Sequence, residues 1–393
     1  MEKIKILHVI KTLELGGAET NLRNLMGCFN HERFEHHVAY SVGGEIEPFF
    51  KGNKKIVLYK YSERSHKNAS FFSLVIILKL IFYMRRQRID IVHTHIFNAH
   101  FWGVFAARLA GVKVVEHVHD FRYYDPTELK RRHGYFNQNR FIRLFKGLSD
   151  IVIVLTRQNR DFLITKKYYL PEQVRIVPNG IPQQGKMSFG RKEVTDKLQL
   201  PEDSFIVFTA CRISKTKNID LIIKIAKKVR ESIPRAVFLI AGDGPILEDY
   251  RARVAKERLD KNVRFVGFYS CLEPLFRAAD LFLLPSFLEL HSIAILEAMS
   301  FDVPILISKD VGCNSDAITD GVNGILLDPF SEEGWAEAII RLFEDEEWRR
   351  TLGSNGGDLC RRQFDIGVNA QRIEAIYGEL FSARHKPCAG KGG

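Results

Sequence analysis

LPSFLELHSIAILEAMSFDVPILIS, at residues 284–308, is the stretch that decides the fold. The apolar run that leads into it predicts a buried strand, which Pro285 ends. A polar loop with Glu289 follows, and Ser292 can cap a helix whose second turn holds Glu297. VPILIS then forms the next strand. Strand, loop, helix and strand in this order predict a parallel α/β sheet.

The same stretch predicts a ligand site. We expect both carboxylates to face one cleft, which also receives the helix N-terminus at Ser292 and Ile293. Unpaired N–H groups and the helix dipole attract phosphate at such an end, and carboxylates accept hydrogen bonds from hydroxyl groups. These features suit a sugar nucleotide. The alternative is that the two glutamates are ordinary surface residues.

Apolar strands alternate with helical patterns along the whole chain. This alternation predicts two doubly wound parallel sheets, joined near residues 181–204. The first series of expected strands covers residues 3–10, 36–42, 55–61, 89–95, 112–119, 150–156 and 174–179, and the second covers 204–210, 235–242, 263–268, 279–285 and 303–308.

Length and composition agree with two globular domains. The chain has 393 residues, too many for one ordinary core. Its 6 cysteines are scattered without CxxC spacing, so we expect neither a disulfide framework nor a zinc knuckle. The N-terminus resembles a first strand more than a signal peptide. We therefore expect a cytoplasmic protein.

Charge is concentrated in the N-terminal half. Residues 1–190 carry a net charge of +14 and residues 191–393 a net charge of −3. This imbalance favours an anionic partner, either nucleic acid or an acidic membrane surface. Residues 71–84 are the most apolar run and are followed by arginines, with more basic residues at 130–132. We expect 71–84 to be a core helix, or alternatively a helix on the membrane surface, because the run is too short to span a bilayer.

The glutamate pair in its context resembles the signature of the retaining group 1, glycogen-synthase-like glycosyltransferases, which also includes family 4-like enzymes of bacterial glycan and lipopolysaccharide synthesis. The resemblance implies a GT-B fold, with two Rossmann-like domains facing a central cleft. Residues 1–185 would form the acceptor-side domain together with a final helix near 365–381. Residues 186–364 would bind the nucleotide sugar, and residues 382–393 would be a disordered tail. The chain departs from the pattern at Leu290, His291, Ser292 and Asp302.

The resemblance implies roles for basic and acidic residues. Arg212 and Lys217 match cations that hold the donor diphosphate, by a bidentate fork and a point charge respectively. Cys211 and Asn218 stand where the family has glycines. Glu289 would hold the donor sugar. Further along the chain, Glu297 would accept hydrogen bonds from the ribose.

Other matched positions lie in loops after strands. The resemblance places Gly16 and Gly17 at the donor phosphates, Gly242 and Asp243 near the nucleotide, and His119 at the donor sugar. Each also has a plainer interpretation. The glycine loops can be simple strand-to-helix turns, and His119 can be a structural histidine.

Histidines alternate along two expected strands, His93 and His95 in VHTH (92–95) and His117 and His119 in EHVHD (116–120), and each pair points both rings to one face. No acidic or cysteine ligand is obviously paired with them, so we expect no metal site. No two aspartates stand two positions apart. A DxD metal clamp is therefore missing, and cations with helix N-termini would meet the charge of the departing diphosphate.

The sequence thus predicts a metal-independent, retaining hexosyltransferase that moves a sugar from UDP or GDP to a glycan or lipid-linked acceptor of cell-surface polysaccharide synthesis. It would be peripheral on the cytoplasmic face of the membrane. One alternative is a non-catalytic GT-B subunit that binds a nucleotide sugar or stabilises a catalytic partner. A nucleic-acid-binding protein is disfavoured, because no RRM, KH or zinc-finger signature is present.

Overall fold

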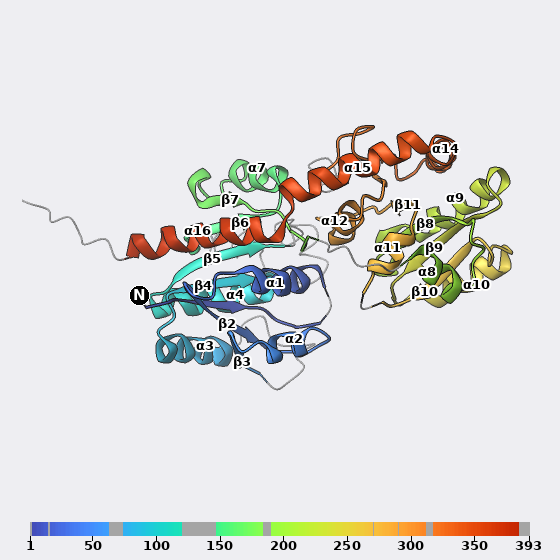
Figure 1. The fold of residues 1–393 in the computed structure, drawn as a ribbon. Helices are drawn as coiled ribbons and strands as arrows, with labels where there is room; N and C mark the ends of the chain where they lie inside the picture. The colour runs from blue at the N-terminus through green and yellow to red at the C-terminus, as the bar shows by residue number, and fades with distance from the viewer. Residues whose placement is uncertain are drawn as a thin grey trace, which may run out of the picture. The chain divides into compact units, whose positions relative to one another are not determined.

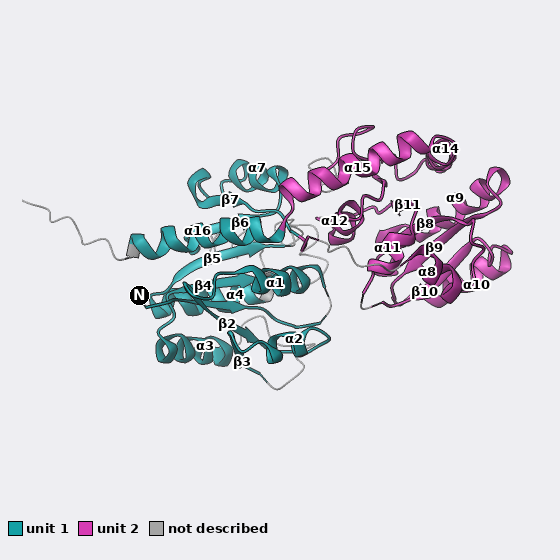
Figure 2. Cartoon of the chain, in the orientation of Figure 1, with its two compact units in different colours: residues 1–180, 366–393 teal, residues 181–365 magenta. Residues whose placement is uncertain are grey.

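The computed structural model describes residues 2–14, 16–62, 74–119, 147–183, 190–269, 271–289, 291–311 and 317–384. Two compact units make up the chain (Figure 2). Unit 1 is Met1–Gly180 with Ile366–Gly393, and unit 2 is Ile181–Asp365. The boundaries expected from the sequence were 185/186 and 364/365.

Unit 1 is built on a seven-stranded parallel sheet with the order β3-β2-β1-β4-β5-β6-β7 (Figure 1). Buried Ile and Val side chains dominate these strands, as expected for a sheet covered on both faces. The strands are β1 Ile4–Val9, β2 Phe34–Tyr40, β3 Ile56–Lys60, β4 Ile91–His95, β5 Lys113–Val118, β6 Ile151–Val154 and β7 Val174–Ile176.

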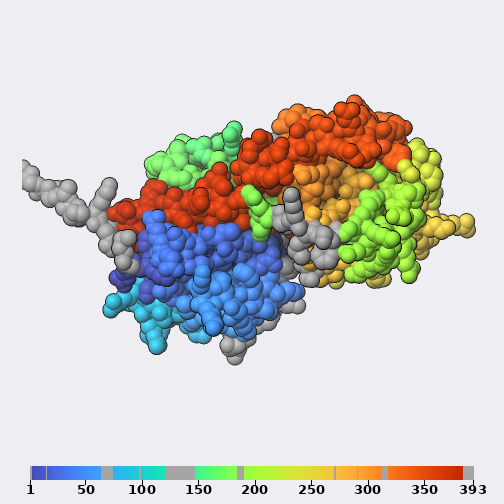
Figure 3. Space-filling model, viewed as in Figure 1, coloured from blue at the N-terminus to red at the C-terminus, as the bar shows by residue number. Residues whose placement is uncertain are grey.

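Helices cover both faces of this sheet. Ile4 and Ile6 of β1 pack in one core with α1, α2 and α16, whereas Leu7 and Val9 pack in a second core with α3 and α4. Figure 3 shows α16, in red, against the blue N-terminal elements of the same unit. The helices are α1 Gly17–Cys28, α2 Glu47–Gly52, α3 Leu74–Gln87, α4 Phe97–Ala110, α7 Arg157–Thr165 and α16 Ile366–Arg384.

Unit 2 repeats this architecture with a six-stranded sheet in the order β10-β9-β8-β11-β12-β13. All its strand pairs are parallel. The strands are β8 Phe205–Ala210, β9 Ala236–Ala241, β10 Val263–Gly267, β11 Leu281–Leu284, β12 Ile305–Ser308 and β13 Ile325–Leu327.

Side chains of β8 alternate between two cores. Phe205 and Val207 pack with α9, α10 and α14, whereas Ile206 and Phe208 pack with α8, α11 and α12 and with Cys360 of α15. The helices are α8 Arg191–Leu198, α9 Ile219–Ser232, α10 Leu247–Lys256, α11 Glu273–Ala278, α12 Ile293–Ser300, α14 Glu332–Glu344 and α15 Glu346–Gln363.

The predicted fold class, two doubly wound parallel sheets, is confirmed. β13 was not predicted, because a strand of three residues is too short to show a pattern. Part of the segment predicted to be a disordered tail is helical. Residues 382–384 continue α16, whose last turns are anchored by buried Leu380, and residues 385–393 lie outside the described part.

Helix α3 packs in the core with one face only. Its buried face includes Ile76, Ile77 and Leu80, and its opposite face exposes Leu78 and Phe82. Among the described residues, no helix is both long enough and apolar enough to cross a membrane. The basic cluster at 130–132 lies outside the described residues.

Candidate functional site

The candidate site of unit 2 lies where the strand order of its sheet reverses. β8 and β11 are neighbours, with Leu281 opposite Val207, although three helices and two strands separate them in the chain. Doubly wound sheets bind ligands at the carboxyl ends of the strands at such a point. The loop after β8 carries Arg212 and Lys217, and the loop after β11 carries Glu289.

Lys217 and Glu289 form an ion pair between these two loops. Lys217 Nζ donates to Glu289 Oε1 over 2.5 Å. Beside the pair, the N–H of Phe287 donates to the carbonyl oxygen of Thr216 over 2.9 Å, which joins the loops. The Glu289 side chain is only 7% exposed and that of Lys217 20%. Partial exclusion of water strengthens the attraction between the two charges.

Arg212 supplies an unpaired charge on the same loop as Lys217. Its side chain is exposed and forms no hydrogen bond or ion pair with the described residues. Lys217 has three N–H donors, so it can keep its bond to Glu289 and still donate to a ligand. Burial raises the pKa of the Cys211 thiol to about 12, so this neighbour stays protonated and uncharged at neutral pH. The loop therefore offers two cations to an anion.

Glycines of the loop after β9 hold the Arg212 loop in position. Gly242 has φ +135, and a Cβ there would stand 1.9 Å from the carbonyl oxygen of Cys211. At Gly244 a Cβ would meet the carbonyl oxygen of Ile213 at the same distance. Only glycine permits backbones to approach so closely. Gly244 was not singled out from the sequence, although the GDG triplet was the available signal.

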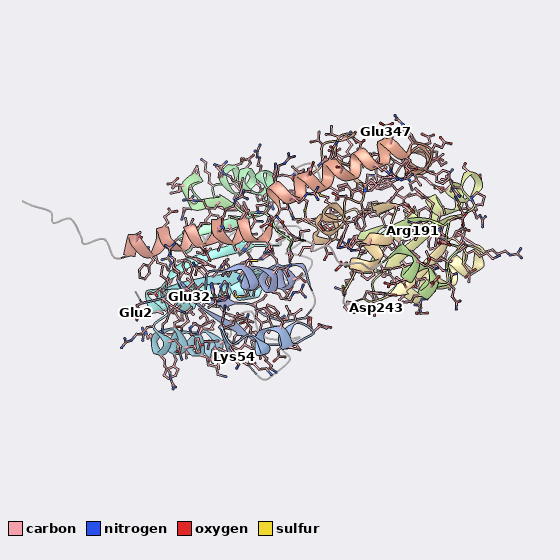
Figure 4. All side chains as sticks on the ribbon, viewed as in Figure 1. Glu2, Glu32, Lys54, Arg191, Asp243 and Glu347 are labelled. Atoms are coloured by element: carbon pink, nitrogen blue, oxygen red, sulfur yellow. The ribbon has the colours of Figure 1, made fainter. Side chains whose placement is uncertain are left out.

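Asp243 and Gly242 make their described contacts within the protein. The carbonyl oxygen of Asp243 accepts the N–H of Ile213 over 2.8 Å, and the N–H of Gly242 donates to the carbonyl oxygen of Gly267, also over 2.8 Å. The Asp243 carboxylate accepts the N–H of Gly244 over 2.7 Å. Figure 4 shows Asp243 at the periphery of unit 2. These contacts account for both residues structurally, and nucleotide contact stays a prediction.

Two departures from the family pattern preserve the backbone that glycine would allow. Asn218 has φ 54 and Asp302 has φ 55. Asn and Asp tolerate this left-handed conformation better than other side-chain-bearing residues. Asn218 also donates from Nδ2 to the carbonyl oxygen of Pro329 over 3.0 Å, which secures the turn after Lys217. The local conformation is therefore compatible with the glycine pattern.

Helix α12 presents the remaining predicted residues of unit 2. The helix begins at Ile293, and Ser292 is the N-cap residue, although its side chain makes no capping hydrogen bond. Glu297 lies on the second turn, as predicted, and is half-buried. His291 is buried against Phe364, with ring centroids 5.5 Å apart, and burial lowers its pKa to about 4. His291 is thus neutral at pH 7. Leu290 lies outside the described residues.

A pocket of about 670 Å³ in unit 2 is lined in part by Phe287, which lies two positions before Glu289 in the chain. Phe287 and Phe330 form one aromatic wall, with ring centroids 5.3 Å apart. Pro329, whose carbonyl oxygen binds Asn218, is part of the same lining. Lys309, Asp310, Val311 and Asp328 complete it.

The glycine loop of unit 1 ends at the N-terminus of α1. Gly16 is the N-cap residue, and Gly17 has open space where a side chain would project. Glu19 folds back beneath this loop and accepts a hydrogen bond from Thr12 Oγ1 over 3.1 Å. Burial raises the pKa of this carboxyl group. Glu19 was not predicted from the sequence, although an acidic residue in the first turn of a helix after GG was a signal.

His119 belongs to a cluster of buried imidazoles on one face of the unit 1 sheet. His95 Nδ1 lies 3.3 Å from His119 Nε2. Burial lowers the pKa of His119 to about 3, so the ring is neutral at pH 7. The cluster comprises His8, His36, His93, His95, His117 and His119.

Comparison with known proteins identifies the class. The fold is GT-B, and two family descriptions match the two halves of the chain. Residues 15–184 match Glycosyltransferase Family 4, and residues 190–358 match Glycosyl transferases group 1. The chain belongs to the group 1, family 4-type glycosyltransferases.

Several curated relatives span most of the chain. The UDP-Gal:alpha-D-GlcNAc-diphosphoundecaprenol alpha-1,3-galactosyltransferase of Escherichia coli is 26% identical and covers 96% of this chain and 97% of its own length. The alpha-monoglucosyldiacylglycerol synthase of Acholeplasma laidlawii is 25% identical over 81% of this chain and 83% of its own length.

Solved structures share the fold. Anabaena Alr3699/HepE in complex with UDP superposes with a TM-score of 0.80 at 20% identity, over 96% of this chain and 100% of that chain. Sucrose-phosphate synthase from Thermosynechococcus elongatus also has a TM-score of 0.80 at 20% identity, over 97% of this chain and 100% of its own.

Proposed function

We propose that this chain transfers a hexosyl group, with retention of configuration, from a nucleoside diphosphate sugar to a glycan or lipid-linked acceptor of cell-surface polysaccharide or lipopolysaccharide synthesis. The observation that carries the proposal is the Lys217–Glu289 pair, with exposed Arg212 on the same loop as Lys217, at the strand-order reversal of unit 2. Two relatives support the acceptor class, because their names include diphosphoundecaprenol and diacylglycerol. HepE, which binds UDP, supports the donor class.

The two cations would stabilise the leaving group. As the bond between the sugar C1 and the diphosphate oxygen breaks, negative charge grows on the diphosphate, where Arg212 and Lys217 donate hydrogen bonds. The acceptor oxygen bonds to C1 on the same face, and its proton passes to the departing phosphate. Glu289 would hold the sugar hydroxyl groups, and Glu297 those of the ribose. The transfer itself then needs no metal ion.

The remaining predicted residues would complete the donor site. Ser292 and Ile293 lie at a helix N-terminus, where N–H groups bind phosphate oxygens. Gly16 and Gly17 offer the same kind of contact at the start of α1. His119, neutral at pH 7, would hydrogen-bond a sugar hydroxyl through a ring nitrogen.

Product analysis tests this function. We expect the purified chain, given UDP- and GDP-sugars with a lipid diphosphate glycan acceptor, to form a product whose new linkage keeps the donor's anomeric configuration in NMR spectra. An inverted linkage would contradict retention. A folded chain that binds a nucleoside diphosphate but neither transfers nor hydrolyses any donor would instead support the non-catalytic GT-B subunit.

We also propose that unit 1 binds an anionic membrane surface through α3. Four apolar side chains of this helix are more than half exposed: Leu74, Val75, Leu78 and Phe82. The helix carries no acidic residue, and Arg85 and Arg86 are exposed near its C-terminal end. An apolar row flanked by cations is typical of helices that lie in the interface of acidic membranes. Each basic residue near such a surface adds about 1 kcal/mol.

Flotation with liposomes tests the membrane surface. We expect binding to vesicles that contain phosphatidylglycerol, weaker binding to neutral phosphatidylcholine vesicles, and release by high salt. Leu78→Glu with Phe82→Glu should abolish flotation. Leu170→Glu changes another residue of unit 1, 59% exposed, and serves as the matched control. Equal or absent binding to both kinds of vesicle would favour a soluble acceptor.

A further inference from the structure

We propose that His95, His117 and His119 of unit 1 form a binding site for a divalent transition-metal ion, with Zn²⁺ as the best-fitting representative. Each residue offers one ring nitrogen, and the three nitrogens all lie within 4.8 Å of one another. Imidazole nitrogen is a preferred ligand of Zn²⁺, whereas Mg²⁺ and Ca²⁺ prefer oxygen. The transfer chemistry proposed above uses no metal, and the two proposals share His119 alone.

The register of the sheet creates this arrangement. His95, at the end of β4, is the direct partner of His117 in β5, and His119 follows two positions later on the same face. Neighbouring strands thus supply three rings to one place. The His117 and His119 ring centroids are 4.0 Å apart, and those of His95 and His119 are 5.6 Å apart.

The spacing of the nitrogens suits a tetrahedral ion. With Zn–N bonds of about 2.0–2.1 Å, two ligand nitrogens of a tetrahedral site lie about 3.3 Å apart. His95 Nδ1 and His119 Nε2 are separated by 3.3 Å. An ion at this place would displace the proton that the two rings share. These two nitrogens therefore already have the separation of two zinc ligands.

Ring nitrogens are available at this place. Within the described part of the chain, neither ring nitrogen of buried His117 has a hydrogen-bond partner, and His119 Nδ1 also has none. An uncompensated buried nitrogen is costly, and a metal bond would satisfy it. Burial lowers the pKa of all three rings, so they are neutral and ready to bind a metal at pH 7.

A neighbouring histidine triad fits less well. His8, His93 and His95 also have nitrogens within 4.8 Å of one another. However, His8 already uses one ring nitrogen toward His95 and the other toward His36, and His93 Nδ1 lies 2.5 Å from the Tyr377 hydroxyl. Several of these bonds would have to break, whereas the proposed site displaces only the hydrogen bond between His95 and His119.

A fourth ligand from solvent would reach the proposed site beside His119. His95 and His117 are 0% exposed, whereas His119 is 9% exposed and marks the accessible side. Three histidines with one open position form a common zinc arrangement. Glu116 is directed elsewhere, because its Oε2 accepts hydrogen bonds from Ser149 and Tyr169, each over 2.9 Å.

One consequence rests on the proposed function. If His119 also holds the donor sugar, a bound ion and the donor compete for the same ring. Saturating Zn²⁺ should then lower turnover of the wild-type chain, and removal of the ion should restore it. His117→Gln should retain basal turnover and lose the sensitivity to Zn²⁺.

Metal titration of the full chain tests the site directly. After treatment with a chelator, we expect the wild-type chain to bind one Zn²⁺ or Co²⁺ tightly and not to bind Mg²⁺. Calorimetry and elemental analysis measure this. Bound Co²⁺ should give a tetrahedral visible spectrum without thiolate charge-transfer bands. His117→Gln and His95→Gln should each weaken binding at least about tenfold. His37→Gln, a buried histidine bonded to Tyr83 outside the cluster, is the matched control.

Several results would overturn the proposal. These are no binding by the wild-type chain, a thiolate band that places the ion on a cysteine, equal loss in His37→Gln, or loss in His93→Gln with none in His117→Gln. The wild-type spectrum decides the matter even if a variant fails to fold. Metal binding without any transfer activity would refute the proposed function and leave the metal site standing.

Discussion

Units 1 and 2 share one architecture, but the residues at the strand-order reversal are charged in unit 2 and neutral in unit 1. In unit 2, the loops after β8 and β11 form the Lys217–Glu289 ion pair, and the loop after β8 also carries exposed Arg212. In unit 1, the equivalent strands β1 and β4 carry His8 and His95, which are buried and neutral. One sheet edge therefore presents full charges, and the other presents neutral imidazoles.

This difference shows that the net charge of each half of the chain does not indicate where the candidate diphosphate site lies. The N-terminal half carries +14, yet its strand-order reversal holds uncharged rings, and its exposed arginines include those of α3. The nearly balanced C-terminal half holds the arrangement suited to a diphosphate. We therefore expect nucleotide affinity to depend mainly on unit 2.

The largest expected effect follows from removing the negative charge of Glu289. Glu289→Gln keeps the shape of the side chain but weakens charge-assisted bonds to the sugar, so kcat should fall about 10²–10³-fold. Initial rates measure it, with circular dichroism to verify folding. Glu248→Gln changes an exposed carboxylate, 79% exposed, and should leave the rate unchanged. A rate within threefold of wild type would remove Glu289 from the site.

Replacing Arg212 and Lys217 one at a time should distinguish their effects on nucleoside diphosphate affinity from their effects on the stability of the fold. Arg212→Ala and Lys217→Ala each remove bonds worth about 1.5–3 kcal/mol, so nucleoside diphosphate affinity should fall at least about tenfold. Only Lys217→Ala leaves nearly buried Glu289 without its partner, which should also destabilise the fold by about 1–3 kcal/mol. Calorimetry and urea unfolding measure the two effects.

A surface ion pair provides the control for these variants. Lys228 pairs with Glu333 at 2.9 Å, and both are well exposed, so Lys228→Ala should change neither property appreciably. Unchanged affinity in a folded Lys217→Ala chain would refute the assignment.

A change in unit 1 should affect turnover and spare nucleotide affinity. His119→Gln removes the proposed contact to the donor sugar, so kcat should fall about 10-fold, while the dissociation constant for the nucleoside diphosphate should stay within about twofold. His37→Gln is again the control. A large loss of nucleotide affinity in His119→Gln would contradict the prediction that unit 2 binds the nucleotide while His119 of unit 1 contacts the donor sugar.

Two glycine substitutions should change the stability of the fold in opposite directions. Gly242→Ala forces a Cβ against the Cys211 carbonyl at φ +135 and should cost about 1–3 kcal/mol of stability while displacing the Arg212 loop. Gly27→Ala, in α1, meets nothing within 4 Å and should stabilise by about 0.5–1 kcal/mol. Thermal unfolding compares them. Equal effects would mean that the loop after β9 does not hold the Arg212 loop.

Chelation should have the smallest effect on transfer. Since the described cations can meet the charge of the diphosphate, turnover should persist in excess EDTA. Loss of activity with EDTA and recovery with Mn²⁺ would contradict this account of the leaving group, whatever the histidine site binds.

The strands were predictable because long apolar runs alternate with helical patterns. β8, predicted at 204–210, is found at Phe205–Ala210, and β5, predicted at 112–119, is found at Lys113–Val118. β13 was missed because three residues show no periodicity. The exposed face of α3 was unpredictable in the same way, since an almost wholly apolar run does not indicate which residues face the core.

The site was predictable as residues but not as contacts. Lys217 and Glu289 were each identified, yet their pairing depends on β11 lying next to β8, which local patterns do not specify. Likewise, alternation predicted that each histidine pair shares a face. Only the register of His95 opposite His117 brings rings from two strands together.

The exposed row of α3 has a consequence for how this protein behaves in dilute buffer. Leu74, Leu78 and Phe82 recur at helical spacing and are each more than half exposed. In the absence of lipid or detergent, water drives such rows together, so two copies of the chain would cover each other's apolar surface. Sedimentation should then depend on protein concentration and become uniform when a mild detergent is added. The mass measured in solution should therefore depend on whether detergent or lipid is present.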